Sequence, residues 1–99
     1  MSQPRWLAKP DGLSSAALKL WKTHAKRLCR EGTLSVENAE SFAALCRLLA
    51  TARAAEAEIN QSGVVFRTKA GVVKQNPACG ILFQAQKQAA ELLKDFNLD

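Results

Sequence analysis

Apolar residues recur at intervals of three or four along much of the 99-residue chain, which is the spacing of one face of an α-helix. The first such stretch is predicted to begin near Ser14 or Ser15, either of which can cap a helix, and to end at Gly32. Residues 1–13 contain prolines and a glycine and are predicted to be an irregular arm. Residues 14–99 are predicted to form one helical domain. The apolar side of the first helix comprises Ala17, Leu18, Trp21, Ala25, Leu28 and Cys29, and excludes Leu20.

A long second helix is predicted to begin after Ser35, a good N-cap, and to stop at Gly63 after about 25 residues. Apolar residues and alanines cover most of its circumference, and a helix of this kind needs burial on more than one side. Alanine is also the best helix former, so a purely intrinsic explanation stays open. We predict that neighbouring copies of the chain cover part of this helix. The residues expected at that contact are Phe42, Leu45, Leu48, Leu49 and Ile59, together with Phe83 from the third helix.

Valines flank a short glycine-containing turn between residues 64 and 76, which predicts a β-hairpin or an extended loop. Asn76 and Pro77 then open a third helix, as the cap and the first helical residue. The inward face of this helix is predicted to hold Ala78, Ile81, Leu82, Ala85, Ala89, Leu92, Leu93 and Phe96.

The net charge of +5 is concentrated in two segments. Residues 1–31 carry seven basic residues against two acidic ones, and residues 64–76 carry three basic residues and no acidic one. Localised positive charge suits a polyanionic partner. On the first helix a row about 16 Å long could contact successive DNA phosphates, although a solvated face that maintains solubility is the alternative. The row comprises Lys19, Lys22, Lys26 and Arg30, with Arg27 beside it.

The second basic segment comprises Arg67, Lys69 and Lys74 in the predicted hairpin. These residues are a second candidate DNA contact. Lysines near a loop tip also prevent strand edges from pairing with other chains, so this segment has an equally good structural explanation.

Enzyme signatures are absent from the sequence, which has no phosphate-binding Gly-x-x-x-x-Gly-Lys loop and no set of nucleophile, base and orienting group. His24 is interpreted as a residue at the border of the apolar face. The three cysteines, at wide spacing and with one histidine, do not form a zinc motif, and all three are expected to be small buried hydrophobes. No apolar run is long enough to span a membrane, and the N-terminus lacks the layout of a signal peptide, so we expect a cytoplasmic protein.

A series of short segments runs from Gly12-Leu13-Ser14, with Ala17 and Trp21, through Gly32-Thr33-Leu34 to Phe42-Ala43-Ala44-Leu45-Cys46. It continues with Glu56-Ala57-Glu58-Ile59, Ser62-Gly63-Val64-Val65, and Gly71 followed by Lys74-Gln75-Asn76-Pro77-Ala78, and ends with Leu92-Leu93-Lys94-Asp95-Phe96-Asn97-Leu98. This ordered series, which covers roughly residues 10–98, resembles a common family of bacteriophage terminase small subunits. No single segment is diagnostic; the order of the segments carries the resemblance.

The resemblance implies a non-enzymatic, ring-forming protein without a cofactor or metal ion. Such a protein binds double-stranded viral DNA in the host bacterial cytoplasm and recruits it to the terminase large subunit. That separate chain is the ATPase and nuclease that packages DNA into procapsids. The expected fold class is therefore mainly α, with a long central helix, a hairpin or loop before the last helix, and a ring oligomer, for which a nonamer is one candidate. The long basic N-terminal arm and C-terminal tail of many relatives are scarcely represented here, so we expect weak, non-specific DNA binding, as would suit headful packaging or a phage-like gene transfer agent.

Two other classes of protein remain as alternatives. A small helical transcription regulator would use one helix for recognition within a compact helix-turn-helix, which the long second helix fits poorly. A structural adaptor without a nucleic-acid role would also be small and helical, but its DNA retention would not respond to reversal of the basic row.

Overall fold

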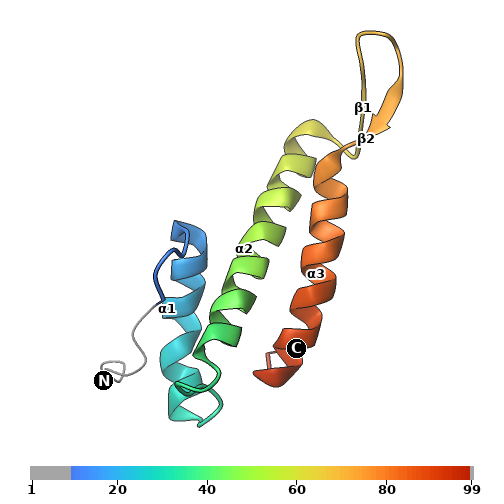
Figure 1. Ribbon diagram of the computed structural model, residues 1–99. Coiled ribbons are helices and arrows are strands. Elements are labelled where there is room, and N and C mark those ends of the chain that lie inside the picture. Colours follow the sequence, from blue (N-terminus) through green and yellow to red (C-terminus); the bar gives the residue numbers. More distant parts are fainter. Residues whose placement is uncertain (1–9, 99) are drawn as a thin grey trace.

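The computed structural model describes residues 10–98 of the chain, which form three α-helices and one β-hairpin (Figure 1). The elements are α1 (Ser15–Arg30), α2 (Ala39–Ser62), β1 (Val65–Arg67), β2 (Val73–Gln75) and α3 (Pro77–Asp95). The prediction of a mainly helical chain, with a long central helix and a hairpin before the last helix, is confirmed. Most of the irregular arm predicted over residues 1–13 lies outside the described residues.

Both ends of α1 are built as the sequence predicts. The Ser14 hydroxyl accepts a hydrogen bond from the backbone N–H of Ala17 at 3.2 Å, which satisfies one of the free donors of the first turn. At the other end Gly32 has a φ of +77°, and the backbone N–H of Thr33 donates to the carbonyl of Leu28 at 2.9 Å. This pair of features is the Schellman type of helix end, in which glycine takes the left-handed conformation without steric cost.

The predicted start of α2 at Ser35 is wrong, because Asn38 organises a turn there first. The Asn38 side chain accepts a hydrogen bond from the backbone N–H of Ser35 and donates one to the carbonyl of Thr33, each at 2.8 Å. These bonds hold residues 35–38 in a turn, and the helix begins at Ala39. Asparagine commonly stabilises such turns by bonding to backbone groups a few residues away.

The three helices lie side by side with α2 in the middle (Figure 1). Helix α3 runs antiparallel to α2 along most of its length, whereas the shorter α1 covers only the N-terminal part of α2. The hairpin projects beyond the far end of α2 and α3, and the molecule is elongated, with extents of 57 × 23 × 17 Å. One end of the molecule is therefore three helices thick, and the other is thin.

Three aromatic rings, from α1, from α2 and from the C-cap of α3, form the centre of the core at the thick end. The ring of Phe42 lies 5.2 Å from that of Trp21 and 5.2 Å from that of Phe96, measured between centroids. Aromatic pairs at this separation are stabilising beyond the area that they bury. Leu20, which does not fit the periodic pattern of α1, is nevertheless buried in this core.

The hairpin is joined to both neighbouring helices by Asn76, a buried polar residue whose side chain both donates and accepts a hydrogen bond. Its amide nitrogen donates to the carbonyl of Gly63 at 2.9 Å, and its amide oxygen caps α3 by accepting from the backbone N–H of Ala78 at 3.0 Å. The antiparallel strands pair in the register Val65 with Gln75, and all six strand residues are exposed. The hairpin is thus anchored at its base by Asn76, and its strands are exposed to solvent in the single chain.

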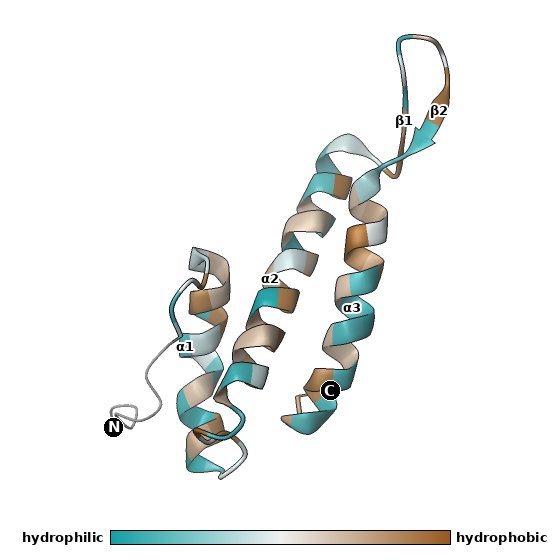
Figure 2. Cartoon of the chain, in the orientation of Figure 1, coloured by the Kyte–Doolittle hydropathy of each residue, from teal (hydrophilic) through white to brown (hydrophobic). Residues whose placement is uncertain are grey.

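Most of the exposed large apolar side chains lie at the thin end of the molecule. Figure 2 shows the hydropathy of the residues along the chain. Ile81 was predicted on the inward face of α3, but it is 51% exposed, because α1 does not reach this part of the helix pair. The exposed large apolar residues of the hairpin and of α3 are Val64, Val65, Phe66, Val72, Val73, Ile81 and Phe83. Within residues 10–98, no helix has the length and apolar character needed to cross a membrane.

Candidate nucleic-acid interface

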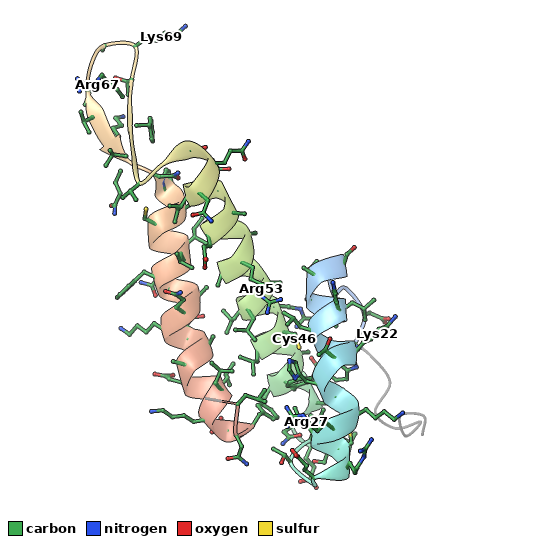
Figure 3. All side chains as sticks on the ribbon, turned by 180° about the vertical axis from the view of Figure 1, so that it is seen from behind. Lys22, Arg27, Cys46, Arg53, Arg67 and Lys69 are labelled. Carbon is green, nitrogen blue, oxygen red and sulfur yellow. The ribbon has the colours of Figure 1, made fainter. Side chains whose placement is uncertain are left out.

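The predicted basic row forms an exposed strip on the outer side of α1. Its members are Lys19, Lys22, Lys26 and Arg30, all of them exposed. The opposite side of the helix, with Ala17, Trp21 and Leu28, is buried against the core. Lys22 accordingly points away from α2 (Figure 3). Burial of the apolar side thus fixes the direction in which the basic row faces.

Arg27 differs from the four members of the row because it already has an acidic partner. Its guanidinium lies 3.3 Å from the carboxylate of Glu31, one helical turn further on. This is the only ion pair formed among residues 10–98. Arg27 therefore belongs to the flank of the candidate interface, and the row itself keeps its full charge.

A further basic residue, Arg53 of α2, adds to the positive potential beside α1. Figure 3 shows its side chain on the side of α2 that faces α1. The pKa of His24 is lowered from its usual 6.5, first by partial burial and then by the positive charges of Arg27 and Arg53. Sequence reasoning did not single out Arg53, because no local pattern shows which residue of a distant helix will lie opposite α1.

The lowered pKa of His24 predicts a specific dependence of stability on pH. The unfolded chain binds a proton at His24 near pH 6.5, whereas the folded chain binds it only at lower pH, so the free energy of unfolding decreases as pH falls below about 6.5. Urea unfolding at pH 7.5 and at pH 5.5 should therefore show a smaller loss of stability in His24→Gln than in the unchanged protein. Equal losses in the two proteins would contradict this assignment.

The second candidate patch, Arg67, Lys69 and Lys74, lies on the exposed hairpin, and Lys69 projects from its tip (Figure 3). The Arg67 guanidinium donates to the carbonyl of Gly71 at 3.4 Å, which directs this charge towards the turn. The hairpin lies at the end of the molecule opposite the aromatic core that α1 covers (Figure 1). A single chain thus presents two separate basic surfaces and does not combine them.

The residues predicted at a contact between copies fall into three groups by burial. Phe42 and Leu45 are buried in the core of the single chain, so they are withdrawn from any surface that another copy could touch. Leu48, Leu49 and Ile59 are half-buried along α2. Phe83 is 64% exposed and is the most exposed of the large apolar residues between positions 10 and 98.

The cysteines only partly follow the prediction that all three are buried. Cys46 lies in the core, and burial raises the pKa of its thiol to about 11. Cys29 and Cys79 are half-buried, so the prediction is wrong for these two. In the part of the chain that the structure describes, no group of three or more potential metal ligands occurs.

The described molecule thus offers a basic helix face, a basic hairpin and an apolar end, while the depressions at α1 and between α2 and α3 are shallow. In a comparison with protein families, the model described as phage terminase, small subunit, matches residues 17–99. The chain therefore belongs to the phage terminase small-subunit family, and its role lies in phage DNA packaging. The resemblance seen in the sequence is confirmed. Neither the curated proteins nor the solved structures provided a match.

Proposed function

We propose that this chain binds double-stranded DNA without catalysing a reaction on it, and recruits that DNA to the terminase large subunit for packaging into procapsids. The setting would be the cytoplasm of a bacterium that produces a phage or a phage-like gene transfer agent. The observation that carries the proposal is the basic row on the outer side of α1, whose four side chains are exposed and have no acidic partner among residues 10–98.

The dimensions of the row suit a DNA backbone. From Lys19 to Arg30 the helix rises about 16 Å at about 1.5 Å per residue. Double-stranded DNA carries about one negative charge per 1.7 Å of axis, so a stretch of this length presents about ten phosphates. Four cations can meet a subset of them and release condensed counterions. This mode of binding needs no contact with the bases, which fits a weak, sequence-independent interaction.

The proposal includes a ring of several copies, of which a nonamer is one candidate. It is supported by the apolar side chains exposed on the hairpin and α3, because small proteins that expose a continuous apolar surface commonly bury it in an assembly. The burial of Phe42 and Leu45 moves the proposed contact from the start of α2 to the thin end of the molecule, where Phe83 lies. In a ring, the α1 rows of several copies would act together on one DNA molecule.

The hairpin is proposed as a second contact with DNA or with the large subunit. Its tip carries Lys69, and Arg67 lies beside it, both far from the α1 row. A projecting basic hairpin could reach a partner that the helices do not touch.

Salt dependence tests the DNA contact directly. Each chain is expected to make four phosphate contacts. A plot of the logarithm of the affinity for a non-specific duplex against the logarithm of the salt concentration should therefore have a slope of about −3.6 or steeper. This slope corresponds to a loss of roughly 100-fold between 50 and 200 mM salt. Fluorescence anisotropy with a labelled duplex measures it. A flat response would reject the phosphate contacts and favour the structural adaptor.

A further inference from the structure

Two exposed rows on α3 each begin with a large apolar residue and carry charges of opposite sign. One row, here called the acidic row, comprises Ile81, Gln84, Gln88, Glu91 and Asp95. The other, here called the α3 basic row to distinguish it from the basic row of α1, comprises Phe83, Lys87, Ala90 and Lys94. At about 3.6 residues per turn the two rows lie roughly 110° apart around the helix. Both begin with a large apolar residue near the hairpin and end with charges near the C-terminus of α3.

None of these charges is used within the single chain. Arg27 and Glu31 make the only ion pair among residues 10–98, so Lys87, Glu91, Lys94 and Asp95 form none, and all four are exposed. Ile81 and Phe83 are 51% and 64% exposed, although both are large and apolar. Ile81 also lines a shallow, mainly apolar depression of about 360 Å³ between α2 and α3, together with Leu48 and Ala85.

We infer that the α3 basic row of one copy packs against the acidic row of the next copy, with the two α3 helices parallel and at the same height. In this arrangement Phe83 enters the depression beside Ile81, which is displaced by only two residues, or about 3 Å along the axis. Lys94 then meets Asp95 and Glu91, while Lys87 reaches towards Glu91. An antiparallel arrangement would instead place Phe83 beside the acids.

The contact uses two different surfaces of each chain, so every copy offers one free surface to the next. Such head-to-tail contacts continue until they close into a ring or extend as a filament. The inference rests on the proposed function, since it specifies the contact by which a ring of this chain would form. It also places α1 outside the contact, which leaves the α1 basic row accessible.

Paired charge reversals in the full-length protein test this contact. Lys87→Glu with Lys94→Glu makes both rows acidic, and Glu91→Lys with Asp95→Lys makes both rows basic. Each double variant alone should lose the oligomer in analytical ultracentrifugation and sediment as a single chain. An equimolar mixture of the two should assemble again, because every contact between unlike variants is complementary. Strict alternation closes a ring only with an even number of chains, so the size of the mixed assembly can differ from that of the unchanged protein. Recovery on mixing cannot arise from changes within either chain.

Two controls separate this inference from the proposed function. Glu37→Lys with Glu40→Lys makes the same change in net charge as Glu91→Lys with Asp95→Lys, but at exposed sites near the start of α2. This variant should leave the oligomer intact. If the unchanged protein assembles but both reversed variants also assemble, the α3 contact is rejected while the ring is retained. If the unchanged protein remains a single chain at every concentration, the ring and this contact are both rejected.

Discussion

Replacing Phe42 with alanine should cost about 3–5 kcal/mol of folding free energy, as truncation of a buried phenylalanine usually does. Phe42 is 1% exposed, and its ring is the middle one of the three that join α1, α2 and α3. Domains of this size are stable by only about 5–15 kcal/mol, so the loss is a large fraction of the total. Urea unfolding followed by circular dichroism should show the midpoint falling by roughly 2 M, given a typical dependence on urea.

Phe66→Ala is the matched control for Phe42→Ala. Phe66 lies in β1 and is 42% exposed, so the same truncation should cost less than about 1 kcal/mol. Comparable losses for the two variants would show that the aromatic cluster does not dominate the core. An unfolded Phe42→Ala protein beside a folded Phe66→Ala protein would support the expectation in its strongest form.

Reversing the charge of the whole α1 row should abolish DNA binding. The variant replaces Lys19, Lys22, Lys26 and Arg30 with glutamate. Loss of about four phosphate contacts at 0.1 M salt corresponds to a decrease in affinity on the order of 1,000-fold, and the added negative charges would repel DNA further. Retention of a labelled duplex in a gel-shift or anisotropy titration measures the effect.

A charge-preserving variant provides the control for the α1 row. In it the three lysines become arginines and Arg30 becomes lysine, so the side chains change while the charges remain. This variant should bind DNA as the unchanged protein does, since phosphate contacts depend mainly on charge. Circular dichroism and sedimentation should show that both variants fold and assemble. Undiminished binding by the reversed variant would exclude α1 as the DNA-contact surface.

Much of the fold could be predicted because the signals that begin and end its helices are local. Ser14, Gly32 and the Asn76-Pro77 pair act through hydrogen bonds and backbone preferences within a few residues, so the sequence reveals the ends of α1 and the start of α3. The start of α2 could not be placed as well, because Ser35 has the character of an N-cap while the Asn38 side chain, by bonding back to Thr33 and Ser35, holds a turn before the helix. Which of Ser35 and Asn38 organises the turn depends on how that loop crosses between two packed helices.

Burial could be predicted less well than secondary structure, because it depends on which helices end where. The periodic pattern places Ile81 inward, yet it is exposed on a part of the helix pair that α1 does not reach. The same pattern made Phe42 a candidate for contact between copies, whereas its position opposite Trp21 and Phe96 places it in the core of one chain. The basic row of α1 was predicted in full, since an exposed helix face is set by spacing along a single element.

The short α1 divides the molecule lengthwise into two regions that contribute differently to folding. At the thick end, substitutions of buried residues act on whether a single chain folds, and their effects would appear as reduced yield of the protein in the cell. At the thin end, Phe83 and the exposed valines contribute little to the fold of one chain, so their replacement would leave the amount of protein unchanged. Under the proposed function, variants of that second kind would be overlooked in a screen for expression and would be detected only in an assay of assembly or of DNA packaging.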